Sequence, residues 1–481
     1  GARRAAGPGG DRWTGRGWEE RAVADGARRG VGGRRRAVSV SGVGLTVGLV
    51  GVLGLGLVGC ASSGPAVGEE GPGMGSVIFV HPDGASSATW AAGRALLVGP
   101  DGMLEWDKLP AMGLYRGHLR DSLTGTSNGG ATVHAFGVKV LSDAYGTSGG
   151  GESARPLVDE EGRSLSIAER ALEEGLDVAL VQTGTSTEPG TGCFLASVPR
   201  RDMHQAIAAQ LIESGAAVML GGGERYYLPE GVEGVHGEGV RTDGRNLVEE
   251  AREAGYRVVF TRDELMGLAP TGQPVLGLFA EDHTFNADPE EELRESGLPL
   301  YWEDAPTVGE MAAVALDVLE RRRTRFLLVV EEEGTDNFGN ANNASGVMEA
   351  MRRADEAFGV ARRYVMSNPR TLLITAADSD GGGMRMLGLR DSDRRETVPA
   401  SMRNGAPVDG VDGAGSAPFV SMPDRFGERH RFMIVWPTYS DVTGGVLVRG
   451  MGLNSDLITP NMDNTDVSEL MRLTLFGAGG G

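Results

Sequence analysis

The segment Thr126–Thr132 is the stretch of this sequence best suited to carry a reactive hydroxyl. Ser127 stands there among residues too small to crowd it, and a helix-like run follows from Val133 to Lys139. A serine at a helix start has free backbone N–H groups beside it and the positive end of the helix dipole beneath it, which favours an anion. Such a serine could attack a phosphate as a nucleophile, or it could simply cap the helix.

Acidic side chains follow three apolar, strand-like runs at the point where each run ends. They are Asp83 after residues 77–80, Glu331 and Asp336 after residues 326–330, and Asp378 after residues 371–375. In open parallel sheets, ligands collect outside the carboxyl ends of the strands, so we expect these acids to meet at one edge, where Ser127 could join them. Carboxylates gathered in this way repel each other strongly unless cations lie between them.

Short apolar runs alternate with longer amphipathic runs along most of the chain. The expected strands are residues 77–80, 178–182, 217–220, 257–260, 326–330, 371–375, 432–436 and 446–449. The expected helices are residues 203–214, 247–254, 308–322, 345–365 and 467–475. This alternation is typical of an α/β fold with a largely parallel sheet. Residues 384–424 are rich in Gly, Asp and Arg, and we interpret them as an irregular insertion.

The charge of the chain narrows the choice of partners. The 481 residues carry a net charge of −20, although residues 1–60 contribute +6, so that the remainder stands near −26. An acidic body argues against nucleic acid as a partner. It would also repel anionic substrates, so an enzyme acting on phosphates here would need metal ions or a local basic site.

The N-terminus has the pattern of a targeting segment. Arg34–Arg36 precede the uncharged apolar run Val43–Val58, which leads into Leu57-Val58-Gly59-Cys60. This pattern resembles a bacterial lipoprotein signal, in which Cys60 would be lipidated; the alternative is a signal anchor with an incidental cysteine. We therefore expect an N-terminal extension and signal in residues 1–60, a flexible tether in 61–75 and one catalytic domain in 76–481. The protein would be exported and held at the cell envelope by a lipid on Cys60.

Six segments in order resemble the alkaline phosphatase family, over roughly residues 76–475. They are Val77–Gly84, Thr126–Lys139, Val198–Met203 with Gly215–Gly223, Gly277–Ala280, Val330–Asp336 with Asp355–Ala357, and Thr371–Asp378. The resemblance implies a three-layer sandwich in which helices flank a central, largely parallel sheet. It also implies a small phosphate ester as substrate and, because the family is often dimeric, a possible homodimer.

The resemblance assigns roles residue by residue. It implies that Ser127 takes the phosphoryl group and that Arg201 grips two phosphate oxygens with its planar fork. The implied metal ligands are Asp83, which would bridge sites, Glu331, at a magnesium-like site, and Asp336 and Asp378, one for each of two paired catalytic ions.

The sequence also departs from the family at the histidines that usually bind zinc. Asn340 stands four residues after Asp336, Ser379 stands directly after Asp378, and residues 439–445 contain no His. With Asn340 and Ser379 counted as ligands, the set offers only oxygen, which suits Mg²⁺, Ca²⁺ or Mn²⁺ better than Zn²⁺. We expect divalent metal ions as cofactors, Mg²⁺ first among them.

Smaller departures surround the nucleophile and the arginine. Thr126 stands where the family has Asp, and the family's Thr is either replaced by Gly190 or displaced to Thr191. Glu188 falls where an acid or His is usual. Of the seven histidines, only His81 and His134 lie close to motif residues, and we interpret both as structural.

The sequence thus predicts a metal-dependent phosphate monoester hydrolase that acts through a phosphoserine intermediate. One alternative is a weakened or inactive phosphatase-fold lipoprotein that binds anions or a partner. Another is a phosphodiesterase of the same superfamily, which would differ in pocket shape. A sulfatase is disfavoured, because no Cys-x-Pro-x-Arg segment is present.

Overall fold

The computed structural model describes residues 73–269, 271–390, 392–393 and 395–478. The predicted signal in residues 1–60, with Cys60, and the predicted tether up to residue 72 lie outside the described residues. No helix in the described part is both long and apolar enough to cross a membrane.

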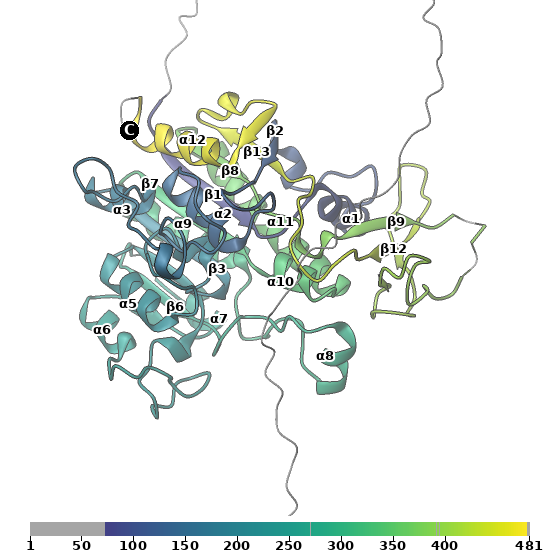
Figure 1. Ribbon diagram of the computed structural model, residues 1–481, viewed down its shortest axis with the longest axis horizontal. Helices are drawn as coiled ribbons and strands as arrows, with labels where there is room; N and C mark the ends of the chain where they lie inside the picture. Colours follow the sequence, from purple (N-terminus) through teal and green to yellow (C-terminus); the bar gives the residue numbers. More distant parts are fainter. Residues whose placement is uncertain (1–72, 270, 391, 394, 479–481) are drawn as a thin grey trace, which may run out of the picture. The chain divides into compact units, whose positions relative to one another are not determined.

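Ten strands form the central sheet (Figure 1). They are β1 (Ser76–Pro82), β2 (Ala111–Arg116), β3 (Asp177–Thr185), β4 (Val218–Gly222), β5 (Arg257–Val259), β6 (Val275–Leu278), β7 (Phe326–Glu332), β8 (Thr371–Thr375), β13 (Leu447–Gly452) and β14 (Asn461–Asp463). Their order is β14-β2-β13-β8-β1-β7-β3-β4-β6-β5. From β8 to β5 every neighbouring pair is parallel, and β13 runs antiparallel to both β8 and β2. The predicted α/β fold with a largely parallel sheet is confirmed.

The central strand β1 sends its side chains alternately into two cores. Val77 and Phe79 belong to one core, whereas Ile78 and Val80 belong to the other. This alternation follows from the two-residue period of a strand, and it shows that both faces of the sheet are buried.

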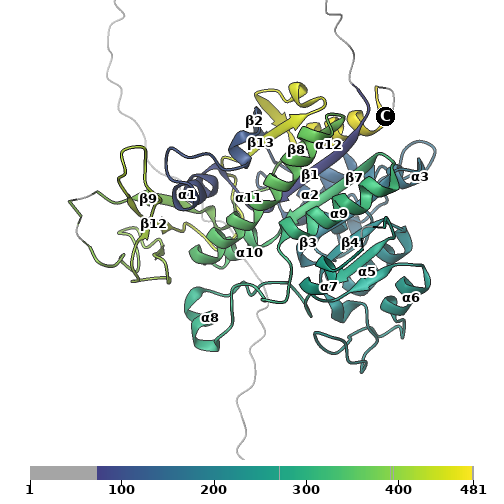
Figure 2. The same ribbon diagram turned by 180° about the vertical axis from the view of Figure 1, so that it is seen from behind.

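Helices cover both faces and complete three layers. The core of Ile78 and Val80 is shared by α1 (Ser87–Leu97), α7 (Arg262–Met266), α9 (Val308–Arg322), α10 (Gly334–Asn340) and α11 (Ala344–Ser367). The core of Val77 and Phe79 is shared by α2 (Ser127–Phe136), α3 (Ile167–Glu173), α5 (His204–Ser214), α6 (Leu247–Glu253) and α12 (Asn464–Phe476). The short helices α4 (Pro189–Gly192) and α8 (Glu290–Ser296) lie in connections. Figure 2 shows α9 and α11 in front of the sheet.

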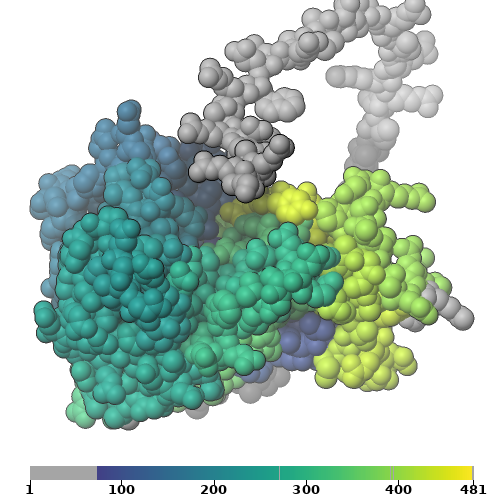
Figure 3. All heavy atoms as spheres, turned by 90° about the horizontal axis from the view of Figure 1, so that it is seen from below, coloured from purple at the N-terminus to yellow at the C-terminus, as the bar shows by residue number. Residues whose placement is uncertain are grey.

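The segment predicted as an irregular insertion contains regular structure. Four short strands form a second, antiparallel sheet: β9 (Arg385–Gly388), β10 (Val408–Asp409), β11 (Phe419–Val420) and β12 (Arg431–Val435). The strand expected at 432–436 is therefore β12, which pairs here and not in the main sheet. Figure 3 shows this part of the chain as a continuous yellow-green surface.

Most predicted elements occur at nearly the predicted bounds. The helix at 308–322 and the strand at 371–375 match α9 and β8 residue for residue, and the other expected strands and helices shift by a few residues. The sequence did not indicate α1, β2 or β14. The strand β2 is half-buried, but its exposed positions include the apolar residues Met112 and Leu114. Polar and apolar residues therefore do not alternate along it, and this alternation is the signal that predicts a half-buried strand.

Candidate active site

The carboxyl ends of the central strands bring the predicted acids together. His81 on β1 pairs in register with Glu331 on β7, and Asp83 follows β1 by one residue. Alternate residues of a strand point to the same face of the sheet. On β1 these are Val77, Phe79 and His81, followed by Asp83, and on β7 they are Leu327, Val329 and Glu331. The apolar residues of both sets belong to the same core. The functional side chains therefore project on the face of the sheet that α2 covers.

Ser127 is the first residue of α2 and is buried, with 8% of its surface exposed. The cap of this helix is Thr126, whose hydroxyl accepts a hydrogen bond of 3.1 Å from the Gly129 N–H. Ser127 is thus not the cap of the helix, and it lies beside the Asp83 carboxylate, whose pKa it helps to lower. A Cβ on Gly130 would lie 2.4 Å from Asp378 Cβ, so only glycine lets the first turn of α2 approach that acid so closely.

Most carboxylate oxygens around Ser127 lack a hydrogen-bond donor. Asp83, Glu331, Asp336 and Asp378 are each at most 5% exposed. Among the described residues, the buried side-chain oxygens without a hydrogen-bond partner include Asp83 Oδ2, both oxygens of Glu331 and of Asp378, Asp336 Oδ1 and Ser379 Oγ. Leaving so many buried acceptors without donors is costly, so this set fits oxygen-seeking divalent cations.

Burial and mutual repulsion shift the pKa values of these acids. Burial, opposed by the charge of His81, raises the pKa of Glu331 to about 8. Burial, followed by neighbouring aspartates, holds the pKa of Asp336 and of Asp378 well above the ordinary range. Burial would also raise the pKa of Asp83, but the close approach and charge of His81 outweigh it and lower that pKa. Without cations, several of these groups would keep protons near neutral pH.

His81 lies inside this cluster, contrary to its interpretation as structural. Its Nε2 is 3.3 Å from Asp83 Oδ1 and 3.9 Å from Glu331 Oε1, and its Nδ1 is 2.8 Å from the Ala376 carbonyl oxygen. Burial would lower the pKa of His81, but the two carboxylates outweigh it and raise that pKa to about 8. One signal in the sequence could have found His81: it precedes Asp83 by two residues on the same strand, so both side chains point to one face.

Asn340 bridges two carboxylates. Its Nδ2 donates to Asp336 Oδ2 and to Asp441 Oδ1, both at 2.9 Å, and its Oδ1 accepts from the Gly382 N–H at 2.8 Å. Burial raises the pKa of Asp441, and the hydrogen bond from Asn340 opposes that rise. Asp441 thus enters the site from the 439–445 segment, where the family's third histidine was expected.

Arg201 is held at the margin of the acid cluster by Glu188. Its Nη2 donates to Glu188 Oε2, and the Glu188 charge raises the pKa of Arg201. The Arg201 side chain is 46% exposed, while that of its partner Glu188 is 8% exposed. The sequence indicated both residues but not their pairing.

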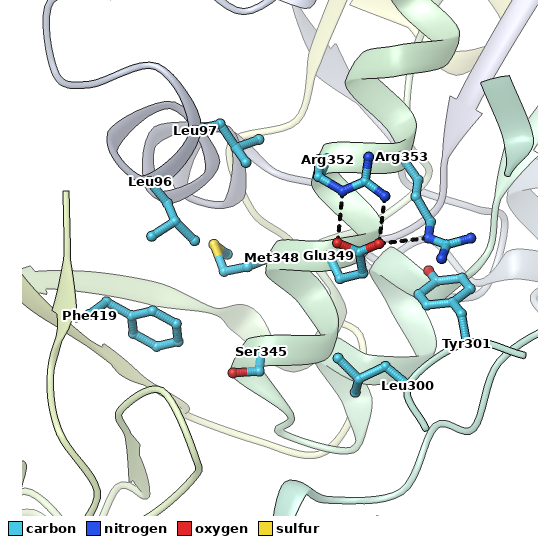
Figure 4. A pocket seen from close by; sticks show the side chains of 10 residues that line it. All are labelled: Leu96, Leu97, Leu300, Tyr301, Ser345, Met348, Glu349, Arg352, Arg353 and Phe419. Carbon is cyan, nitrogen blue, oxygen red and sulfur yellow. Dashed lines mark hydrogen bonds and ion pairs between the residues drawn. The ribbon is translucent and has the colours of Figure 1, made fainter. Parts of the chain in front are cut away.

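A cavity of about 260 Å³ reaches the acids, and Asp378, Ser379 and the segment 442–444 line it. A separate cavity of about 500 Å³ lies beside α11 (Figure 4). Its Glu349 is paired with Arg352 and Arg353, and neither Ser127 nor any predicted metal ligand lines it. Of these two cavities, only the smaller is lined by predicted metal ligands, namely Asp378 and Ser379.

Comparison with known proteins agrees with the fold and the motifs. The alkaline phosphatase family model matches residues 75–408, and the chain belongs to this family. A membrane-bound alkaline phosphatase of Bombyx mori is 28% identical over 414 residues, which cover 76% of this chain and 72% of the relative. A streptomycin-6-phosphate phosphatase of Streptomyces griseus is 26% identical, with coverages of 67% and 77%. The repressible alkaline phosphatase of Saccharomyces cerevisiae is 28% identical, and the match spans only 55% of its length. These relatives support a hydrolase.

Solved structures agree on the fold. The alkaline phosphatase of an Antarctic bacterium has a TM-score of 0.63 at 17% identity, covering 85% of this chain and 100% of that one. The Thermus thermophilus alkaline phosphatase also has a TM-score of 0.63, at 23% identity, with coverages of 85% and 93%. A variant of the Antarctic enzyme was solved with Mg bound; it has a TM-score of 0.61 at 17% identity, covering 84% and 99%.

Gly190 gives a direct test of the packing around Glu331. A Cβ at Gly190 would lie 1.6 Å from Glu331 Oε1, and Glu331 is 0% exposed and has no room to withdraw. We expect Gly190→Ala to destabilise the protein by about 1–3 kcal/mol, as overpacking does. The control is Gly388→Ala, where no atom lies within 4 Å, with a change of about 0.5 kcal/mol or less. Urea unfolding measures both, and equal effects would contradict this packing.

The stability of chelator-treated protein should fall as pH rises from about 6.5 to about 8. The pKa of Glu331 rises from 4.5 to about 8 on folding, so in this window the folded state holds a proton that the unfolded state has released. The pKa of His81 rises from 6.5 to about 8, so its contribution is present below 6.5 and is lost through about 8. Calorimetry with and without excess Mg²⁺ measures the trend. A melting temperature that is flat or rising in chelator would contradict it.

Proposed function

We propose that this protein is a metal-dependent phosphate monoester hydrolase in which Ser127 forms a phosphoserine intermediate. The observation that carries the proposal is the position of Ser127: it stands at the start of α2, beside Asp83, and buried carboxylate oxygens that lack donors surround it. Family membership supports the same reaction class.

In the first step, Ser127 Oγ bonds to phosphorus while the bond from phosphorus to the ester oxygen breaks. The serine loses its proton, and the departing alcohol gains one. Asp83 lies beside the hydroxyl and can orient it by accepting its hydrogen bond, and the N-terminus of α2 favours the anionic phosphate. In the second step, water attacks the phosphoserine, which releases inorganic phosphate and restores the hydroxyl.

Arg201 would bind the phosphate oxygens that point away from the acids. Glu188 holds one guanidinium nitrogen, and the exposed remainder of the fork can donate to two oxygens of a phosphate. This pairing also keeps a positive charge at the edge of an otherwise acidic site.

Divalent cations would be held by Asp83, Glu331, Asp336, Asp378 and Ser379, with Asn340 spacing Asp336 from Asp441. When bound, such ions would supply charge compensation for the phosphate and favour the ionised serine. Because nearly all of these donors are oxygen, Mg²⁺ is the cofactor that we propose for the Asp336 and Asp378 side of the site, with Mn²⁺, Ca²⁺ and Zn²⁺ as the alternatives to be compared.

The decisive variant is Ser127→Ala, assayed with p-nitrophenyl phosphate in Mg²⁺, Ca²⁺, Mn²⁺ or Zn²⁺ and in chelator. We expect turnover that depends on a divalent cation and that falls by at least about 10³-fold in the variant, because the nucleophile is lost. The exposed Ser401→Ala is the control and should retain activity.

Three outcomes would count against the proposal. Absence of turnover with every metal would favour an anion-binding protein that keeps the fold. Unchanged turnover in Ser127→Ala would exclude the phosphoserine route. A larger kcat/KM for bis-p-nitrophenyl phosphate than for the monoester would favour a phosphodiesterase.

We also propose that the protein is exported and anchored by a lipid on Cys60, with a homodimer as its assembly. The support for the anchor is the arginine run and the apolar run before Leu57-Val58-Gly59-Cys60. Mass spectrometry of the mature N-terminal peptide tests it: we expect the chain to begin at Cys60 with acyl groups attached, and an unmodified Cys60 would exclude the anchor.

A further inference from the structure

His81 is a buried histidine whose Nε2 faces two carboxylates. Its side chain is 1% exposed, and Nε2 has no hydrogen-bond partner among the described residues. The other nitrogen, Nδ1, lies 2.8 Å from the Ala376 carbonyl oxygen, which can only accept, so Nδ1 carries the proton in the neutral ring. The lone pair of Nε2 is then directed at the carboxylates of Asp83 and Glu331.

The two distances from Nε2 to the carboxylates are short enough for ligands of a shared ion. The three candidate donor atoms of His81, Asp83 and Glu331 all lie within 4.8 Å of one another, with Nε2 3.3 Å and 3.9 Å from the two oxygens. Two ligands that are each about 2.1 Å from one ion lie at most about 4.2 Å apart, so both nitrogen–oxygen distances are compatible with a common cation. Histidines that bind metals commonly donate their second ring N–H to a carbonyl or carboxylate, as Nδ1 does here.

The fold places this nitrogen beside a Glu331 carboxylate that is tightly packed but has no hydrogen-bond donor. Glu331 extends over Gly190, where a side chain would collide with its carboxylate. Neither Glu331 oxygen has a hydrogen-bond partner among the described residues. His81 and Glu331 stand opposite each other on β1 and β7, so the sheet itself fixes their separation.

We propose that His81 Nε2 is a direct ligand of the cation bound between Asp83 and Glu331. This part of the site is then a mixed nitrogen and oxygen site that favours a transition-metal ion such as Mn²⁺ or Zn²⁺ over Mg²⁺, because imidazole suits those ions better. The inference rests on the metal dependence in the proposed function, and it replaces an all-oxygen set at this position with one that includes an imidazole.

His134 provides a matched control. It is also fully buried, and its ring centroid lies 5.5 Å from that of His81. Its Nε2 is 2.8 Å from the Tyr115 hydroxyl, and in the part of the chain that the structure describes its ring forms no ion pair with a carboxylate. A change of His134 therefore disturbs the same layer of the fold without removing the proposed ligand.

The test uses the purified full chain, stripped with chelator and loaded with Mn²⁺ alone, and reads nitrogen coupling to the bound ion by pulsed electron paramagnetic resonance. We expect coupling to one imidazole nitrogen in the wild type, its loss in His81→Gln and its retention in His134→Gln. We also expect the ratio of Mn²⁺ to Mg²⁺ affinity, measured by calorimetry, to fall by about ten-fold or more in His81→Gln only.

Absence of nitrogen coupling in the wild type, or failure of the wild type to bind Mn²⁺, would overturn the inference without any variant. Coupling that persists in His81→Gln would overturn it as well. If circular dichroism shows that His81→Gln is not folded, the paramagnetic resonance spectrum of the wild type alone still tests the inference. Because these readings need no turnover, a protein that couples nitrogen but hydrolyses nothing would contradict the proposed function and leave the role of His81 intact.

Discussion

The crowding of buried carboxylates around Ser127 is the constraint on which the rest of this structure depends. Asp83, Glu331, Asp336 and Asp378 share a space that water scarcely reaches, where like charges interact strongly and donors are few. The metal-free chain meets this cost by keeping protons on some acids and by placing His81 against Asp83. Parallel pairing of β1 with β7 and β8, between two apolar cores, holds the acids in place despite their repulsion.

Much of this arrangement could be predicted from the sequence, because it follows from local rules. Apolar strand runs that alternate with amphipathic helices predicted the α/β sheet, and the acids after residues 77–80, 326–330 and 371–375 had to meet at its carboxyl edge. The family motifs added Ser127. That the hydroxyl of Ser127 is free for chemistry, whereas Thr126 caps the helix, needed the geometry of the turn.

The parts that sequence reasoning missed depend on contacts between distant segments. The direction of His81 becomes significant only once β1 is known to pair with β7, some 250 residues away in the chain. The bridge from Asn340 to Asp441 likewise joins residues 101 positions apart, whereas Arg201 and Glu188, 13 positions apart, are paired by the fold of a nearer loop. The second sheet could not be predicted for another reason. Its strands β10 and β11 have only two residues each, which is too few to show an alternation of apolar and polar residues in a Gly-rich segment.

Metal binding and folding are coupled in such a site, since its ligands are brought together only by the folded sheet. The free energy of binding cations therefore adds to the stability of the same strand ends whose charges oppose folding. On the ligand roles proposed above, the two sides of the site differ: carboxylates and a hydroxyl surround the Asp336 and Asp378 side, whereas the Asp83 and Glu331 side has an imidazole. Hard cations suit the first and transition-metal ions the second. On these roles, metal preference would differ across the site, and Asp83, whose charge acts on both Glu331 and Asp378, would be common to its two sides.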